Sequence, residues 1–309
     1  MSGPHVHPQG HTTPGIVAGV AAVLMWAAGN IMVRGVPMSG VQIAFWRILL
    51  GAMVYWLLVK SRRRSLRWEH LKASAPAGIA ISIEIAVFFV ALKTTTVANA
   101  VIIGSLQPLV LLTFATRRFG ERRSGLLIAV ASVAVGGVAL VLFGSTSQPT
   151  WSPRGDILAF MAMLLFSAYY VLAKDARQRV PALEFQAGVW IVGTFVLAPI
   201  AVIEAGGVVV PSAQNWLWLL ALLAVPGTGH LLMNWSHNHI RLSLAAMLSL
   251  GITVLSTIGA AIFLDEHVAP IQVVGIVIVL TVMAYAITQE AALGETHTAP
   301  QAPVSVETG

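Results

Sequence analysis

The sequence of 309 residues contains no cysteine, and only 10% of its residues are charged. The lack of cysteine excludes a disulfide framework, a thiolate metal site and a cysteine nucleophile. The lack of charge excludes an ordinary soluble domain, because such domains carry about 25% charged residues. Most of the chain is therefore expected to lie in an apolar environment.

Apolar residues make up 57% of the chain, and its mean hydropathy is +0.82. A stretch of about 20 apolar residues spans a bilayer as a helix. Ten such stretches occur, at residues 15–35, 38–60, 72–93, 97–117, 124–144, 155–174, 182–204, 215–238, 242–264 and 269–289. The sequence therefore predicts an all-α integral membrane protein with ten transmembrane helices.

Basic residues are distributed unequally between the two sides of these segments. If the N-terminus lies inside, fourteen of the 18 lysines and arginines fall in cytoplasmic connections. Only Arg34, Lys93 and Arg154 fall outside, and Arg47 lies within the second segment. Cytoplasmic loops are enriched in lysine and arginine. We therefore expect a multi-pass protein of the bacterial inner membrane with both termini in the cytoplasm.

The net charge of +6 and the pI near 10.2 also raise the question of nucleic acid binding. The basic clusters "KSRRRSLR" and "RRFGERR" are short connections with little aromatic interleaving. Such clusters beside membrane spans are typical of contact with anionic lipid. We expect membrane lipid, and no nucleic acid, as their partner.

The two halves of the chain align with each other. A shift of 140 residues matches Gly15 with Gly155, Trp26 with Phe166, and Arg34 with Lys174, and a shift of 145 matches Glu121 with Glu266. Each half then holds five spans, and an odd number places the second copy upside down in the membrane. Inverted repeats are typical of secondary transporters, which bind substrate near the midplane.

This repeat divides the chain into parts. Residues 15–144 form the first five-helix repeat, 145–154 a linker, and 155–289 the second repeat. Residues 1–14 and 290–309 are rich in Pro, Gly, Thr and His, and we expect disorder in both. His5, His7 and His11 lack supporting thiolates or carboxylates, so we expect no metal site and no cofactor.

The stretch "ALKTTTVANAVIIGSLQPLVLLTFATRRFGERRSGLLIAVASVAVGGVAL", from Ala91 to Leu140, resembles the end of an EamA repeat. Its features are a short turn after Leu92, Pro108 within the fourth helix, and Gly120 before Glu121. The chain thus resembles ten-helix EamA-type exporters of the drug/metabolite transporter (DMT) superfamily. The second copy departs from the pattern, with Thr253 where proline is usual and "LDE" in place of "LGE".

This resemblance implies two inverted EamA repeats around a central cavity lined mainly by helices 1, 3, 4, 6, 8 and 9. It also implies alternating access, in which the two repeats move against each other. Within the superfamily, the aromatic amino acid exporters of the YddG type are the expected analogue, on the strength of the aromatic candidates below.

Glu84 lies within "ISIEIAVFFV", near the middle of the third segment. A charge at the bilayer centre costs roughly 2.5–3.5 kcal/mol and requires a function or a partner. One hypothesis makes Glu84, with Phe88 one turn away, a cavity residue that attracts a substrate ammonium or carries a proton. The other makes it the partner of Arg47 in a structural ion pair. Gly229 and Ala187 stand at the repeat-related positions, so the second repeat lacks both charges. This joint absence favours pairing, and the two roles of Glu84 are compatible with each other.

His230 lies in the eighth segment, one position from the counterpart of Glu84. It is either a protonatable site residue or a neutral histidine bonded to a neighbouring helix. Pro226 and Gly227 precede it and loosen the helix, and transporters expose backbone to substrate at broken helices. We therefore assign these two residues to gating.

The fourth segment contains Gln107 and Pro108 near its middle, where the proline removes a backbone hydrogen bond and predicts a kink that could serve as a gate. Gln107, and Ser249 in the ninth segment, are candidates for contact with substrate. Small polar side chains in membrane helices also join helices to one another, so both roles stay open.

Five further residues suggest that a planar substrate is stacked. Trp26 and Asn30 lie one turn apart on the first segment, and Tyr170 is the repeat counterpart of Asn30. Tyr169 and Trp235 complete the set. Aromatic residues at helix ends are typical interface anchors, but Trp26 lies nearer mid-depth. Glu121 and Glu266 end repeat-related helices, and we assign them to helix-end structure.

The sequence therefore predicts a secondary transporter that exports small organic metabolites, with amino acids, aromatic ones included, as expected substrates. A proton-coupled drug or cation exporter is the alternative, and an intramembrane enzyme or a channel is less favoured. No HExxH, Gly-x-Ser-x-Gly or nucleotide-binding P-loop motif is present, so we expect no enzyme. The partner is a small-molecule substrate, and the chain is expected to be a monomer or a weak homodimer.

Overall fold

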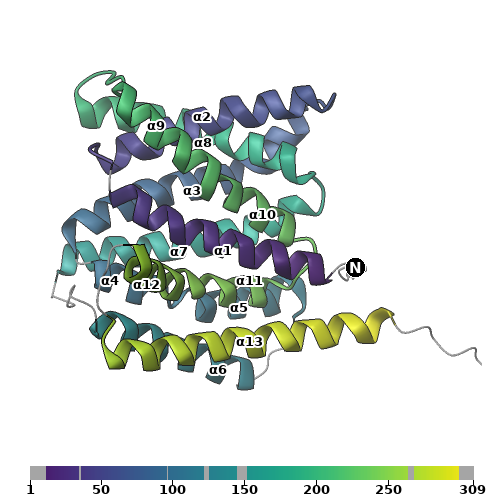
Figure 1. Ribbon diagram of the computed structural model, residues 1–309. Coiled ribbons are helices and arrows are strands. Elements are labelled where there is room, and N and C mark those ends of the chain that lie inside the picture. The colour runs from purple at the N-terminus through teal and green to yellow at the C-terminus, as the bar shows by residue number, and fades with distance from the viewer. Residues whose placement is uncertain are drawn as a thin grey trace, which may run out of the picture.

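A computed structural model describes residues 12–34, 36–95, 97–121, 125–144, 152–263 and 268–298. Every regular element in these ranges is a helix, and Figure 1 shows the helices running side by side across the molecule. The first half of the chain forms α1 (Thr12–Arg34), α2 (Gly40–Ser61), α3 (Trp68–Thr94), α4 (Val97–Gly104), α5 (Gln107–Phe119) and α6 (Gly125–Phe143).

The second half begins with α7 (Pro153–Arg177) and α8 (Ala182–Ala205). It continues with α9 (Ala213–Leu222), the π-helical turn η1 (Leu223–Gly227), α10 (Thr228–Ser236), α11 (Leu242–Ser249), α12 (Gly251–Phe263) and α13 (Pro270–Thr298). The last helix thus continues past residue 290, where the sequence predicted the tail to begin. Glu290 is buried there and bonds to the Arg241 backbone.

Nine segments of the described residues are long and apolar enough to cross a membrane. They are α1, α2, α3, α6, α7, α8, α13, and the composite segments α9–η1–α10 and α11–α12. Helices α4 and α5 are too short individually, with 8 and 13 residues, and together form the remaining crossing. The prediction of ten transmembrane helices in two repeats is confirmed.

The two repeats are interrupted at matching places. Between α4 and α5 the helix breaks at Ser105 and Leu106, and between α11 and α12 it breaks at Leu250. Ser105 and Leu250 correspond under the same shift of 145 residues that aligns the two sequences. The fourth and ninth crossings are therefore broken spans of the same design.

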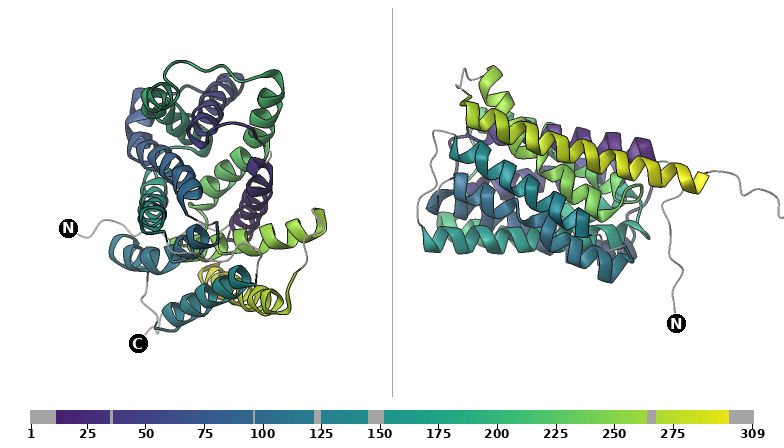
Figure 2. Two further views of the ribbon diagram at one scale, coloured as in Figure 1. Left: turned by 90° about the vertical axis from the view of Figure 1, so that its left-hand side faces the viewer. Right: turned by 90° about the horizontal axis from the view of Figure 1, so that it is seen from below.

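Contacts at the helix ends show that the repeats are inverted. The Ser236 hydroxyl donates to Gly15 O at 2.7 Å, so α1 begins beside the end of α10. Lys174 Nζ donates to Ile240 O at 2.8 Å, so α7 ends at that same end of the bundle. The last turns of α13 also lie there, with the start of α1 (Figures 1 and 2). Repeat-related helices α1 and α7 thus run in opposite directions.

We call this end of the bundle the basic end, because lysines and arginines gather there. The described members of the cluster are Lys60, Arg62, Arg63, Arg64, Arg67, Lys72, Arg117, Arg118, Lys174, Arg177, Arg179 and Arg241. Trp56 and Trp68, both exposed, lie beneath the ammonium groups of Lys60 and Lys72 at 5.7 and 5.5 Å. Such aromatic and basic pairs are typical of a membrane–water interface.

The helix packing follows the repeat. Helix α3 packs on α7, and its counterpart α10 packs on α1. Helices α4 and α5 also pack on α7, and their counterparts α11 and α12 pack on α1. Helix α2 packs on its own counterpart α8, and α6 packs on its counterpart α13. Helices α6 and α13 form a separate pair at one edge of the bundle (Figure 2, left). The core between these helices therefore brings together residues of both repeats.

Two glycines allow α6 and α13 to pack backbone against backbone. A Cβ atom at Gly137 would lie 2.9 Å from Ile278 Cγ2 and 3.1 Å from Gly275 O. Small residues let membrane helices approach closely, because lipid provides no hydrophobic force to drive them together. The pair therefore depends on the absence of side chains at this crossing.

Replacing Gly137 with valine is expected to lower the free energy of unfolding by about 1–3 kcal/mol, because the added side chain must displace α13. Gly136 is the matched control, since nothing lies within 4 Å of a Cβ atom placed there. Gly136→Val should change stability by less than about 0.5 kcal/mol. Thermal unfolding of both variants in detergent measures the difference, and equal melting temperatures would contradict this packing.

Candidate functional site

His230 lies at the centre of an aromatic cluster deep in the bundle. Its ring centroid is 5.0 Å from that of Trp26, 5.5 Å from that of Trp190, and 6.5 Å from that of Tyr169. These residues come from α10, α1, α8 and α7, and all are buried. Both repeats therefore contribute to the cluster, as expected for the substrate region of an inverted-repeat protein.

Glycines on two helices make room for the indole rings of Trp26 and Trp190. A Cβ atom at Gly229 would lie 3.1 Å from the Trp26 indole, and one at Gly51 would lie 3.1 Å from Trp190 Cδ1. Gly229 is the repeat counterpart of Glu84. Where the first repeat has the side chain of Glu84, the second repeat has none, and the Trp26 indole packs there against Gly229.

Phe166, the repeat counterpart of Trp26, extends the cluster along α7. Its ring lies 6.3 Å from that of Trp26, 5.0 Å from that of Tyr170, and stacks on that of Tyr169 at 6.1 Å. Repeat-related residues meet where a pseudo-twofold axis passes. The contact between Trp26 and Phe166 therefore places this aromatic cluster at the axis between the repeats.

Arg47 and Glu84 bring opposite charges to this region from α2 and α3. Each lies close enough for its charge to act on the other, and Glu84 also acts on Tyr169. Within the described residues, however, no hydrogen bond joins them, and their nitrogen and oxygen atoms do not approach within 4.0 Å. The ion pair expected from the sequence is not a direct contact here.

Several buried polar atoms around this pair have no hydrogen-bond partner in the described part of the chain. They are Arg47 Nε and Nη2, Trp26 Nε1, Trp190 Nε1, His230 Nδ1 and the Tyr170 hydroxyl. An unsatisfied buried group costs about 1–3 kcal/mol, and more when it is charged. A polar molecule bound among these groups would recover that cost, so the cluster has the chemistry of a binding site.

The π-helical turn lies beside the cluster, where the sequence predicted a loosened helix. Pro226 and Gly227 both belong to η1, and the Tyr55 hydroxyl donates to Gly227 O at 3.0 Å. Helix α1 also packs here, because a Cβ atom at Gly29 would lie 2.9 Å from Pro226 Cβ. Turns of this kind occur often at functional sites.

The two broken spans meet near their interruptions. Ser249 Oγ donates to Gln107 Oε1 at 3.0 Å and to Ala246 O at 2.6 Å. Gln107 is buried, and its Nε2 atom has no partner in the described residues. Pro108 lies in the first turn of α5, so the helix stops and restarts instead of bending around the proline. Gln107 and Ser249 thus join the two repeats.

Two predicted site residues, Trp235 and Phe88, lie away from this aromatic cluster. Trp235 stacks on the imidazole of His239 at 3.9 Å, close to the basic end. Phe88 packs against the small buried group formed by Ala91, Ala100 and Ala159. The side chain of Asn30 lies outside the described residues.

Besides Phe166, four residues near the site were not predicted from the sequence. Trp190 and Tyr55 contact it directly, as described above. Asn234 and Gln186 continue it toward the basic end, because the Tyr169 hydroxyl donates to Asn234 Oδ1 at 2.9 Å, and Asn234 Nδ2 donates to Gln186 Oε1 at 2.7 Å. The available signal was that each is a polar or aromatic residue within a predicted apolar segment.

His237 lies beyond this polar chain, in the connection between α10 and α11. It is buried against the ring of Tyr170, 5.0 Å away, and neither ring nitrogen has a partner in the described part of the protein. Burial, with the positive charges of Lys174 and Arg177, lowers the pKa of His237 to about 3. His237 is therefore neutral at physiological pH.

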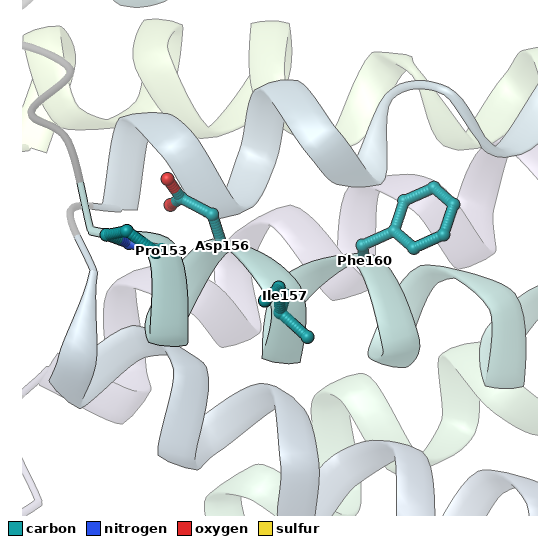
Figure 3. A pocket seen from close by; sticks show the side chains of 4 residues that line it. All are labelled: Pro153, Asp156, Ile157 and Phe160. Carbon is teal, nitrogen blue, oxygen red and sulfur yellow. The ribbon is translucent and has the colours of Figure 1, made fainter.

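A surface hollow of about 300 Å³ lies at the start of α7, lined by Pro153, Asp156, Ile157 and Phe160 (Figure 3). Asp156 accepts a hydrogen bond from Thr95 Oγ1 at 2.6 Å and so ties the first turn of α7 to the residue that ends α3. The hollow is open and its other walls are apolar. In the described residues, no three His, Asp or Glu side chains gather in a way that could hold a metal ion.

The fold agrees with what comparison with other proteins finds. A crystal structure described only as "Crystal structure of protein" is similar over 90% of this chain and 98% of its own, with a TM-score of 0.76 and 21% sequence identity. That likeness shows a shared fold alone, and no curated protein matches the chain. The family model described as EamA-like transporter family matches residues 13–143 and 153–288. The chain belongs to the EamA-like transporter family of the DMT superfamily and carries two copies of its repeat.

Proposed function

We propose that this transporter is a secondary carrier that exports amino acids, aromatic ones included, by alternating access between its two repeats. The observation that carries the proposal is the presence of two opposite charges, Arg47 and Glu84, that share one region without contacting each other. A free amino acid carries the two complementary charges. Its carboxylate fits the guanidinium of Arg47, and its ammonium fits the carboxylate of Glu84.

The unpartnered atoms of Arg47 support the role of its guanidinium. Nε and Nη2 are adjacent on the edge of the guanidinium group, and both lack a partner in the described residues. Two adjacent N–H groups of this kind bind a carboxylate in a bidentate manner, with two parallel hydrogen bonds. An incoming carboxylate would thus satisfy both atoms at once.

The aromatic cluster supports a substrate with a planar side chain. Trp26, Tyr169 and Trp190 surround His230, and Phe166 extends the apolar surface toward Tyr170. Aromatic rings in such a cluster bind another ring by edge-to-face or offset stacking, worth about 0.5–1.5 kcal/mol beyond burial. This favours aromatic over small aliphatic amino acids.

The orientation follows from the basic end. Because lysine and arginine concentrate on the cytoplasmic side of membrane proteins, the basic end faces the cytoplasm of a bacterial cell, with both termini on that side. Export then means binding from the basic end and release at the opposite one. Tagging each terminus in whole cells and probing it with impermeant protease tests this orientation.

Purified protein in liposomes tests the function. Uptake of radiolabelled phenylalanine, tyrosine and alanine is measured over a range of concentrations. The proposal expects saturable uptake, with tighter half-saturation for the aromatic compounds. A rate that rises linearly with concentration would indicate a channel, and failure to transport any amino acid would overturn the substrate assignment.

A proton-coupled mechanism is a second candidate, favoured by two titratable side chains of this region, Glu84 and His230. Nδ1 of His230 is buried and has no hydrogen-bond partner in the described residues. Coupling would make a pH gradient drive accumulation above the equilibrium level. Equal final levels with and without the gradient would indicate facilitated diffusion instead.

A further inference from the structure

The carboxylate of Glu121 joins three helices at the basic end. It accepts hydrogen bonds from the backbone N–H groups of Leu242, at 2.7 Å, and Ser243, at 3.3 Å. Lys174 Nζ lies 3.8 Å from the same carboxylate. Glu121 follows α5, Leu242 and Ser243 begin α11, and Lys174 belongs to the last turn of α7. The first repeat is thus tied to the second by one side chain.

The local backbone directs Glu121 to this position. Gly120 ends α5 in the left-handed region, with φ 66°, and the N–H of Glu121 donates back to Ala115 O at 3.2 Å. A left-handed residue is the usual end of a helix, and glycine adopts it without strain. The turn brings the carboxylate to the N-terminus of α11, where unpaired N–H groups and the helix dipole favour an anion.

Lys174 is held in the same contact. Its side chain is only 12% exposed and that of Glu121 only 9%. Besides facing Glu121, its ammonium donates to Ile240 O at 2.8 Å and lies 5.3 Å from the centre of the Phe119 ring. Buried charges interact strongly and are costly to separate unless water reaches them.

These contacts close the basic end of the bundle between the two broken spans. Helices α5 and α11 touch at mid-depth through Gln107 and Ser249, and again at their basic ends through Glu121 and Leu242. While both contacts hold, α5 and α11 cannot separate to leave a passage from the central cluster to the basic end. Opening it requires α11 to leave Glu121, and water entering from that side would solvate the separated groups.

We propose that Glu121, Lys174 and the first turn of α11 form a latch, the Glu121 latch, that controls access to the central cluster from the basic end. This rests on the proposed transport function, because a latch has a purpose only where substrate passes. Glu121, assigned from the sequence to helix-end structure, thus becomes a positioning residue for the conformational step of transport. It has no role in substrate recognition.

The chain supplies a matched control for this proposal. Glu290 also binds the start of α11, since its carboxylate accepts from the Arg241 N–H at 2.7 Å and pairs with the Arg241 guanidinium. Both partners, however, belong to the second repeat. Loss of the Glu290 carboxylate removes a contact at the same helix end without freeing one repeat from the other.

The absence of cysteine makes a distance measurement direct, because introduced cysteines are the only sites that spin labels modify. Labels are placed at Arg117→Cys on α5 and Asn238→Cys in the connection that precedes α11, both exposed positions, and distances are recorded by electron paramagnetic resonance in lipid nanodiscs. Without substrate, labelled protein that retains Glu121 should give mainly a short distance between the two labels. Glu121→Ala should add a population longer by about 5 Å or more, close to one helical turn.

Two further variants complete the test. Glu121→Gln keeps an oxygen that accepts from the N–H groups but loses the attraction to Lys174, so it should give a smaller longer-distance population; it also carries the test if Glu121→Ala does not fold. Glu290→Gln should leave the short distance unchanged. Distances in both Glu121 variants identical to the unmodified protein, or an equal shift in Glu290→Gln, would overturn the latch. Because the measurement needs no substrate, it is independent of whether amino acids are transported.

Discussion

Replacing Glu84 with glutamine is expected to lower amino acid uptake by roughly ten- to hundredfold and to leave the protein folded. The reason is that a hydrogen bond to a charged group contributes about 1.5–3 kcal/mol, and the amide cannot provide it to a substrate ammonium. Folding should survive, because Glu84 makes no hydrogen bond or ion pair in the described structure that the amide would lose. Initial rates in liposomes at substrate concentrations below half-saturation give the ratio directly.

Glu204→Gln is the control for this change. Glu204 is exposed at the opposite end from the basic cluster and accepts a hydrogen bond from Ser39 Oγ at 2.8 Å, which an amide oxygen can also accept. Its removal should leave uptake within about twofold of the unmodified protein. Full uptake by Glu84→Gln would show that the Glu84 carboxylate does not contact substrate.

Replacing Arg47 with methionine should also lower the rate of uptake, by about a hundredfold or more, because the substrate carboxylate loses a bidentate partner. Stability is expected to be unchanged or to rise, since Arg47 is buried with two unpartnered nitrogens, and an apolar side chain of similar length removes that cost. Thermal unfolding in detergent and uptake in liposomes are measured on the same preparation.

The double variant Arg47→Met with Glu84→Gln distinguishes recognition from mutual neutralisation. If the two charges serve only each other, the neutral pair should regain both stability and uptake. If both bind substrate, the double variant should transport no better than either single one. Recovery of uptake to more than about half the unmodified rate would assign the charges to a structural pair.

Much of the fold could be predicted because it depends on properties that are additive along the chain. Apolar length gave the spans, and the position of lysines and arginines placed both ends of the described chain on one side. The repeat could be read from matches such as Gly15 with Gly155. The structure explains this match, because each glycine packs closely against a residue of the other repeat, and these two partner residues are themselves repeat-related. A Cβ atom at Gly155 would lie 2.6 Å from Thr95 N, and one at Gly15 would lie 3.1 Å from Ile240 Cγ2; positions 95 and 240 differ by 145 residues.

The site was harder to predict because it depends on which helix faces meet. Trp190 has no distinguishing neighbours in sequence, and its place beside His230 depends on the facing helix, where Gly51 leaves room for the indole ring. One of the two hypotheses for Glu84 paired it with Arg47, because the second and third segments are antiparallel neighbours. Helix α3 instead packs more extensively on α7 and α8, and the described residues show no direct contact between the two charges.

The breaks in the fourth and ninth spans show what single residues can and cannot predict. Pro108 predicted a kink within one helix, whereas the span is interrupted and the proline stands in the first turn of the second half-helix, a position that proline favours because its missing N–H is not needed there. The matching break at Leu250 has no proline. It was therefore visible only through the repeat, by its alignment with Ser105.

Recognition of a zwitterion is tested most directly by three compounds that share one ring. Phenylalanine has both charges, phenethylamine only the ammonium, and 3-phenylpropionate only the carboxylate. Uptake of radiolabelled phenylalanine into liposomes is measured with each unlabelled compound as competitor. If Arg47 and Glu84 each bind one substrate charge, phenylalanine should compete at least about tenfold better than either analogue, since each lost charged contact contributes about 1.5–3 kcal/mol. Equal competition by phenethylamine or by 3-phenylpropionate would contradict two-point recognition.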